Sequence, residues 1–345
     1  MRTTLLLFLF GVLWYGVLAA EETAPSKERT GRISRAVTRG LTIVGRAAGN
    51  YPKHRKCFSC HHQTLPLLAM QSAGDAGIKV DGELFARQLD FTRTSFSTRR
   101  ENLQKGERIG GRAATVGYAL WTLAIADAKP DPLAADLVAY LLKTQQADGR
   151  WRPPSHRPPL EDSHVTCTVL AAYGLTRYAE ASQEEAAMQA VTRAQTWLAT
   201  AKLVSQEDRV ARLWGLVLFP GEDRPLQSAR ETVWKTQRKD GGWAQLDDRD
   251  SDAYATGQTL FVLHQSGVTP NRPQFARGIG FLLKTQQKDG SWLVRSRSKP
   301  VQQYFDNGDP HGKDQFISIA ATSWAVAALS AALPRQADID PSGEK

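Results

Sequence analysis

Hydrophobic residues recur with a helical period along most of this chain, in two kinds of segment that alternate. One kind is amphipathic and carries Lys, Arg and Gln on its polar side, which is typical of a helix at the outside of a protein. The other kind is rich in Ala, Leu and Val with few charges, which predicts a helix buried on most of its faces. The buried kind is expected at residues 63–73, 115–126, 165–178, 210–219, 254–264 and 317–333.

A sequence repeat connects these segments. The stretch that ends at Trp151 returns almost unchanged before Trp292, and a third copy ends at Trp243. These tryptophans are 92 and 49 residues apart, so one degenerate unit is expected between the first two, around residues 187–202. A repeat of about fifty residues fits a helical hairpin.

Two weaker matches extend the repeat towards the N-terminus. Arg-Gly-Leu at 39–41 matches Arg-Gly-Ile at 277–279, and Gln-Thr-Leu at 63–65 matches the same tripeptide at 258–260. With these matches the chain contains six outer–inner hairpins. Two rings of six helices would close on themselves and would need no polar capping repeats.

The first twenty residues have the features of a signal peptide. Arg2 precedes an apolar run at 5–18 that ends in two alanines, a small-residue cleavage site. The run is short for a bilayer span, so we predict export to the periplasm or the exterior, with an uncleaved N-terminal anchor as the alternative. A linker at 21–30, one domain at 31–335 and a flexible tail at 336–345 would follow.

The repeated unit Gln-x-x-Asp-Gly-x-Trp resembles the repeats of the squalene-hopene cyclase and protein prenyltransferase superfamily, whose fold is an all-α, α/α toroid. The resemblance covers three of the six predicted hairpins well and the others weakly. It implies that a Gln and the closing Trp tie the end of each outer helix to the next loop, which is a structural role. The implied pairs are Gln146 with Trp151, Gln237 with Trp243, and Gln286 with Trp292.

The hexapeptide 57–62, Cys-Phe-Ser-Cys-His-His, precedes the first buried segment. Its C-x-x-C-H spacing is that of c-type haem attachment, in which Cys57 and Cys60 bind the haem vinyl groups and His61 binds the iron. Covalent haem would make this an electron-transfer or redox ligand-binding protein with a redox partner. Zinc held by Cys57, Cys60 and either His61 or His62 is one alternative, and a disulfide is another.

A second iron ligand, or a fourth zinc ligand, has to come from elsewhere in the chain. In the implied toroid the loops from outer to inner helices share one rim around a central cavity, and the longest of them are 95–113, 150–163 and 293–316. The hexapeptide belongs to the first such loop and should face the same cavity. The candidate ligands are His54, His62, Met70, His164 and His311, and the acidic residues expected on this rim are Asp162, Asp250 and Asp252.

The resemblance also implies cyclase chemistry, in which an Asp-x-Asp-Asp motif protonates an alkene or epoxide. The nearest stretch is Asp-Ser-Asp-Ala at 250–253, so Asp252 would be the catalytic proton donor to a small apolar or polyprenoid ligand in the cavity. The alternative is that Asp252 caps the helix that begins at Tyr254. Carbocations are stabilised by aromatic rings, for which the candidates are Tyr118, Trp121, Tyr173, Trp214, Tyr254, Phe261 and Trp324.

Other activities of that superfamily have less support in the sequence. An Asp-x-Cys zinc motif at the late repeats and a Cys-Gly-Glu-Gln thioester stretch are both absent. The acidic residues of the rim keep a carbohydrate-active enzyme as an alternative, because glycosidases work with a pair of carboxyl groups.

The chain is basic, with a formal net charge of +9 and a pI of about 9.5. This charge favours an acidic redox partner, an acidic polymer or an anionic membrane surface. The sequence has no nucleic-acid-binding motif, so no nucleic-acid partner is expected. The segment 93–112 is rich in Arg and Lys and is expected to form a mobile basic loop.

Overall fold

The computed structural model describes residues 27–300 and 303–334. Within these residues it has thirteen α-helices, one short 3-10 helix (η1, Gly312–Asp314) and no β-strand. The predicted signal peptide and C-terminal tail lie outside the described residues. The first helix, α1 (Lys27–His54), begins inside the predicted linker.

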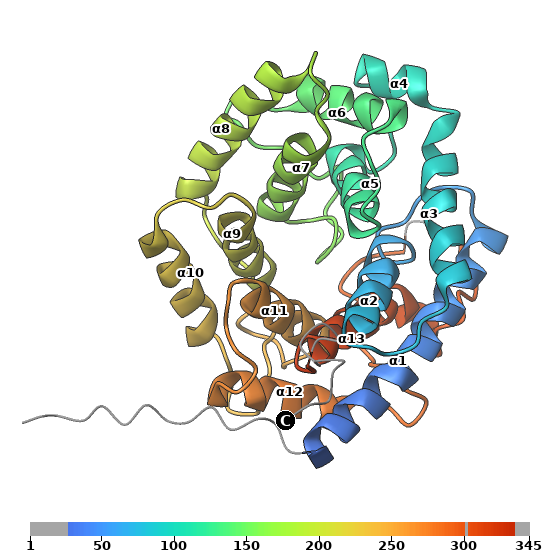
Figure 1. Cartoon of the computed structure of the whole chain (residues 1–345), viewed down its shortest axis with the longest axis vertical. Coiled ribbons are helices and arrows are strands. Elements are labelled where there is room, and N and C mark those ends of the chain that lie inside the picture. The colour runs from blue at the N-terminus through green and yellow to red at the C-terminus, as the bar shows by residue number, and fades with distance from the viewer. Residues whose placement is uncertain (1–26, 301–302, 335–345) are drawn as a thin grey trace, which may run out of the picture.

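Six helices form an inner ring (Figure 1). Each packs against the next one, and the last packs against the first, so that the ring is closed. Its members are α2 (Thr64–Asp75), α5 (Arg112–Ile125), α7 (His164–Tyr178), α9 (Gln206–Leu218), α11 (Ala253–Gln265) and α13 (Gln315–Ser330).

An outer ring surrounds the inner one (Figure 1). It consists of α1 and five further helices, each packed on its inner neighbours, and a short helix α4 (Arg100–Lys105) lies against α6. The five are α3 (Gly82–Ser97), α6 (Pro132–Thr144), α8 (Glu184–Thr200), α10 (Asp223–Lys235) and α12 (Pro273–Thr285). The predicted α/α toroid is therefore confirmed.

The two kinds of predicted segment correspond to the two rings. In the inner helix α13 every residue of 317–330 is buried, whereas the outer helix α10 buries only Ala229 and Val233. Helices that are apolar on all sides can only lie between other helices, so the composition places them inside. None of the described helices has the length and apolarity that a bilayer crossing requires.

The three repeat tryptophans hold each outer helix to the following inner helix. In each, the indole Nε1 donates a 2.9 Å hydrogen bond to a carbonyl near the end of the outer helix. The backbone N–H of the same tryptophan donates to a threonine hydroxyl of the next inner helix. The carbonyls belong to Leu141, Val233 and Leu282, and the hydroxyls to Thr168, Thr256 and Thr322.

The last repeat closes the toroid onto the first helix. Gln286 Nε2 donates to the carbonyl of Gly290 at 3.0 Å and to the carbonyl of Ala36 in α1 at 2.9 Å, while Arg39 donates to Gln286 Oε1. Gly290 has a φ of +99°, and a Cβ there would lie 2.6 Å from the Arg39 carbonyl oxygen. We call these four residues the seam.

One predicted pair of the repeat is wrong. In the first copy Gln145, and not Gln146, makes the contacts of the repeat: its Nε2 donates to the carbonyls of Gly149 and Ala190. Gln146 Nε2 instead donates to a carbonyl two residues back, at Thr144. The reason is that α6 ends at Thr144, so that Gln145 occupies the C-cap as Gln286 does for α12.

The expected mobile basic loop is also corrected. Most of the segment 93–112 is helical, in the end of α3, in α4 and in the start of α5. Arg93 pairs with Asp131, and Arg100 pairs with Asp136, both acidic residues coming from the start of α6. The segment is ordered because carboxylates of the next hairpin neutralise its charge.

Candidate functional site

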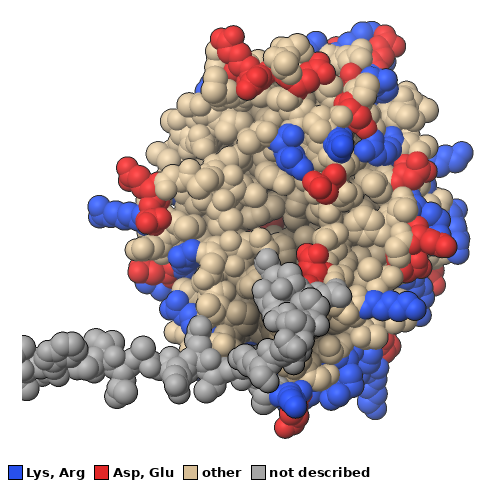
Figure 2. Space-filling model, viewed as in Figure 1, with Lys and Arg blue, Asp and Glu red and all other residues tan. Residues whose placement is uncertain are grey.

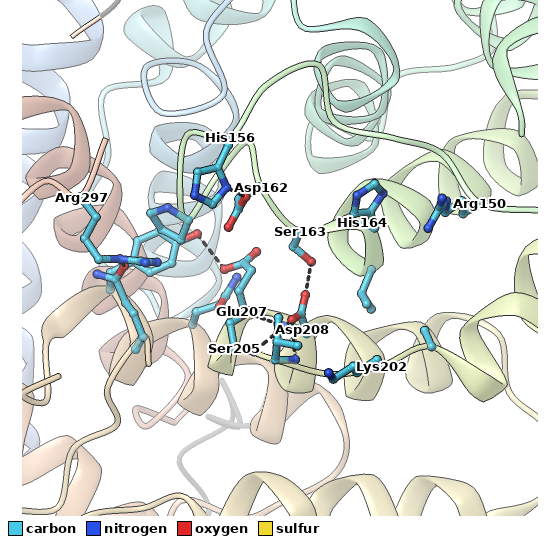
Figure 3. A pocket seen from close by; sticks show the side chains of 18 of the residues that line it. Arg150, His156, Asp162, Ser163, His164, Lys202, Ser205, Glu207, Asp208 and Arg297 are labelled. Atoms are coloured by element: carbon cyan, nitrogen blue, oxygen red, sulfur yellow. Dashed lines mark hydrogen bonds and ion pairs between the residues drawn. The ribbon is translucent and has the colours of Figure 1, made fainter. Parts of the chain in front are cut away.

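A cavity of about 520 Å³ lies where the inner helices α7, α9 and α11 begin. The loop before α7, the loop before α9 and the segment before α13 supply the rest of its wall. Figure 3 shows side chains from these elements converging on it. Of the acidic residues predicted for the rim, Asp162 lines this cavity, and so does His164. We call it the Glu207 cavity, after the buried carboxyl group in its wall.

Glu207 is the second residue of α9 and is buried. Its Oε1 accepts a 2.7 Å hydrogen bond from the Thr166 hydroxyl, and its Oε2 accepts a 3.0 Å bond from the Tyr254 hydroxyl. Burial raises the pKa of Glu207 to about 7, and hydrogen bonds from Thr166, Gln258 and Tyr254 only partly oppose this. The group therefore carries a transferable proton near neutral pH.

Two further carboxylates line the same cavity, and they differ in their surroundings. Asp162 is only partly buried and pairs with His156, also on the loop before α7. Asp208 belongs to the capping box of α9 and accepts hydrogen bonds from the Ser163 hydroxyl and the backbone N–H groups of Val204 and Ser205. Asp208 is thus occupied in holding the helix start, whereas Asp162 is partly exposed in the wall of the cavity.

Asp252, the proton donor implied by resemblance, is the N-cap of α11. Its Oδ1 accepts from the backbone N–H of Ala255 at 2.9 Å, and its Oδ2 accepts from Gln245 Nε2 at 2.9 Å. The helix-cap alternative is therefore what the structure shows. Burial raises the pKa of Asp252 to about 6, but Gln245 and Ala255, not Asp252, line the Glu207 cavity.

Six of the seven predicted aromatic residues form one cluster inside the inner ring. The rings of Trp121 and Trp214 lie 4.6 Å apart between centroids, and Trp324 lies 6.0 Å from Trp121. The void between these rings measures only about 10 Å³. Tyr118, Tyr173 and Phe261 join the cluster at its edges, whereas Tyr254 binds Glu207.

The cysteine hexapeptide faces a different, smaller pocket of about 250 Å³. The Cys57 thiol is exposed and lies 3.4 Å from the Tyr51 hydroxyl, while Cys60 is buried with its thiol 3.3 Å from His61 Nδ1. Burial, together with the nearby guanidinium of Arg157, lowers the pKa of His61 to about 3. A neutral imidazole of this kind is the form that binds metals.

The other candidate ligands do not gather around His61. His62 is fully buried, with Ser59 Oγ on Nδ1 and Asn307 Nδ2 on Nε2. Met70 lines a groove between α1 and α3, His164 lines the Glu207 cavity, and His311 binds Ser291. His54 stacks on Phe305.

A metal centre is therefore not assembled in this conformation. Within residues 27–300 and 303–334, no three His, Cys, Asp or Glu side chains are grouped as ligands for a metal ion. Apart from the adjacent His62, whose two ring nitrogens are both hydrogen-bonded, none of the candidate second ligands named above lies beside His61 in this structure. Covalent haem remains a prediction from the sequence.

One hairpin separates the two pockets. Arg157 and Glu161 form an isolated bridge between their backbones and face the pocket of the hexapeptide. His156 and Asp162, next to them in sequence, face the Glu207 cavity. The insertion at 150–163 predicted to border a site thus borders both.

Sequence reasoning missed Glu207, Gln258 and Arg297, which all line the main cavity. A signal for Glu207 was available in the stretch Ser205-x-x-Asp208, a capping box that starts α9 at Gln206. The predicted start at residue 210 left Glu207 in a loop. Nothing local marks Gln258 or Arg297, because the side chains that meet them come from other hairpins.

Comparison with known proteins shows the fold. No family model matches the chain, and no curated protein matches it. A solved wild-type glycosidase has a TM-score of 0.62 at 13% identity, covering 90% of this chain and 100% of that one. A glycosidase variant in complex with glucose has a TM-score of 0.60 at 13% identity and the same coverage. The type II terpene cyclase MstE from Scytonema, without ligand, has a TM-score of 0.57 at 16% identity, covering 87% of this chain and 98% of that one.

Proposed function

We propose that this chain is a hydrolase that cleaves a carbohydrate by general acid–base catalysis in the Glu207 cavity. The observation that carries the proposal is the buried carboxyl group of Glu207, whose pKa of about 7 suits a proton donor at neutral pH. It shares the cavity with a second carboxylate, Asp162. Two carboxyl groups in unlike surroundings, one buried and one solvated, are the arrangement that divides acid and base roles in glycosidases.

The lining of the cavity supports a hydroxylated ligand over a hydrocarbon. Gln258 is 6% exposed, and its Oε1 has no hydrogen-bond partner within the described part of the chain. His164 Nδ1 likewise has no hydrogen-bond partner within the described residues. Both atoms would gain a partner from a sugar hydroxyl. Two of the similar folds are glycosidases, one of them with glucose bound, which agrees with this class of ligand.

The proposed reaction follows from these positions. Glu207 gives its proton to the glycosidic oxygen as the bond to the anomeric carbon breaks, and its carboxylate is then held by Thr166 and Tyr254. Asp162, beside His156, takes a proton from the attacking water or attacks the anomeric carbon itself. In either case a water supplies the hydroxyl of the product, and its proton returns to a carboxylate.

A second candidate is a terpenoid-cyclase-like enzyme, and the aromatic cluster favours it. Asp252, with its pKa of about 6, would protonate an alkene of a polyprenoid, and Trp121, Trp214 and Trp324 would stabilise the cation. The similarity of the fold to a type II terpene cyclase agrees with this candidate. Because the void in the cluster is about 10 Å³, the rings would have to separate to admit the chain.

One set of variants distinguishes the candidates. Wild-type protein, Glu207→Gln and Asp252→Asn are assayed for release of reducing ends from neutral and acidic oligosaccharides and for turnover of a polyprenoid. We expect Glu207→Gln to lose about 100- to 10,000-fold in carbohydrate hydrolysis, since that is the usual contribution of a general acid, and Asp252→Asn to lose little. Wild-type hydrolysis should fall as the pH rises above about 7, where Glu207 loses its proton.

The opposite pattern of variant activities would support the cyclase. If Asp252→Asn abolishes polyprenoid turnover and Glu207→Gln does not, the second candidate replaces the first. An unaltered hydrolysis rate in Glu207→Gln rejects the hydrolase.

A further inference from the structure

Cationic side chains stand at both ends of the Glu207 cavity. Figure 3 shows Arg297 at one end, Arg150 and Lys202 at the other, and Glu207 and Asp208 between them. Excess positive charge is not gathered on the face seen in Figure 2, where Lys and Arg alternate with Asp and Glu around the periphery. In the cavity the three cationic groups lie apart at the two ends, with the carboxyl groups of Glu207 and Asp208 between them.

Arg297 has guanidinium N–H groups that are not engaged in an ion pair with a described carboxylate. Its Nε donates to Gln245 Oε1 at 2.8 Å, and none of the described carboxylates lies within ion-pair distance of its guanidinium. The side chain is half-buried and belongs to the wall of the cavity. Asp162 and Asp252 act on this guanidinium electrostatically, but since neither pairs with it directly, it can hold a planar anionic group through two parallel hydrogen bonds.

The opposite end offers charge and an aromatic surface together. The Arg150 guanidinium lies over the Trp197 ring at 5.9 Å and forms an ion pair with Asp148. Lys202 follows α8 and is exposed at the mouth of the cavity. An indole beside cationic groups provides apolar contact for a sugar ring and attraction for an acidic substituent on it.

We infer that the Glu207 cavity takes an acidic oligosaccharide, with one carboxylate or sulfate group on Arg297 and a neighbouring acidic sugar at Arg150 and Lys202. This inference names the substrate class of the proposed hydrolase and rests on that function only for the catalytic step. The orphaned Gln258 Oε1 supplies the complementary acceptor for a sugar hydroxyl. The net charge of +9 would draw an acidic polymer to the chain over a longer range.

The test measures binding separately from turnover. Glu207→Gln protein is applied to an array of neutral, uronic-acid and sulfated oligosaccharides, and affinities for the bound sugars are then measured by calorimetry. We expect binding to acidic sugars, weakened about tenfold or more when Arg297→Gln is added, because one charge-assisted contact is lost. Binding of uronic-acid but not sulfated sugars, or the reverse, identifies the acidic group.

Lys299→Gln is the matched control. It removes one positive charge from the same segment, and Lys299 is exposed and outside the wall of the cavity. The affinity of the Lys299→Gln protein for acidic oligosaccharides should therefore be unchanged. Thermal unfolding of each variant shows that it is folded.

Binding to neutral sugars alone, no binding at all, or equal loss in Arg297→Gln and Lys299→Gln overturns the inference. Arg297-dependent binding of acidic sugars without any hydrolysis by the wild type would sustain the inference and reject the proposed function.

Discussion

The pKa of the Glu207 carboxyl group is determined by where the residue lies in the fold. The residue follows the N-cap of a helix whose start is held by Ser205 and Asp208, and it is buried between α7 and α11. In an exposed helix start the same carboxyl group would be ionised at neutral pH, since helix N-termini favour negative charge. Here desolvation dominates, and the pKa rises to about 7.

This shift has a consequence for stability. The folded-state pKa of Glu207 lies above its ordinary value of 4.5, so the folded protein binds the proton more tightly than the unfolded chain. The stabilisation is complete below pH 4.5 and is lost as the pH rises through about 7, at about 1.4 kcal/mol for each pKa unit. We expect Glu207→Gln, which never ionises, to raise the Tm relative to wild type at pH 8 more than at pH 4.

The exposed Glu231 on α10 gives the control for that measurement. Glu231→Gln should change the Tm by a similar small amount at both pH values. A pH-independent effect of Glu207→Gln would contradict the assigned pKa.

The two cysteines of the hexapeptide differ in accessibility, which tests the haem prediction. Cys57 is exposed, whereas Cys60 and Cys167 are buried, and burial raises the pKa of both buried thiols. We expect iodoacetamide to modify Cys57 alone in the native protein and all three cysteines after denaturation, as read by mass spectrometry. Protein in which Cys57 and Cys60 stay unmodified after denaturation, with the added mass of a haem, would instead establish covalent attachment.

At the scale of elements, the sequence predicted the helices well and their ends less well. The apolar composition of α7, α11 and α13 identified them as buried because no other part of a helical protein tolerates such surfaces. The pair Gln146 with Trp151 is wrong although the repeat itself favours Gln145, which lies six residues before Trp151 as Gln237 and Gln286 do before their tryptophans. Helix α4 was missed because its order depends on Asp136, which belongs to another hairpin.

The same limit applies to the site. Asp162 and His164 could be placed at the cavity because the loop that carries them is a long insertion in the repeat. Arg297 and Glu207 come to line one cavity only through the folding of hairpins that are far apart in sequence, and a single sequence holds no record of that arrangement.

At the scale of the whole molecule, the seam holds the toroid closed. Gly290 has a positive φ, and an added Cβ would meet the Arg39 carbonyl of α1 at 2.6 Å. We expect Gly290→Ala to lower the Tm, with a loss of about 1 kcal/mol or more from backbone strain alone. Thermal unfolding followed by circular dichroism measures the change.

Gly280 provides the opposite case within the same hairpin. It lies in α12, is exposed, and has no atom within 4 Å of an added Cβ. Gly280→Ala should therefore raise stability by up to about 1 kcal/mol through helix propensity. Equal shifts of the Tm in both variants would show that the seam contributes nothing.

The seam joins residues that can meet only late in folding. Gln286 and its partner Ala36 are 250 residues apart in sequence, and α1 packs mainly on α13, the last helix. The part of α1 that packs on α13 is therefore covered only after α13 has been synthesised, whereas α2 and α3 can pack on α1 earlier. Contacts of such separation are slow to form and leave hydrophobic surface exposed in the meantime, so α1 in the nascent chain carries an apolar surface that is open to aggregation until α13 covers it.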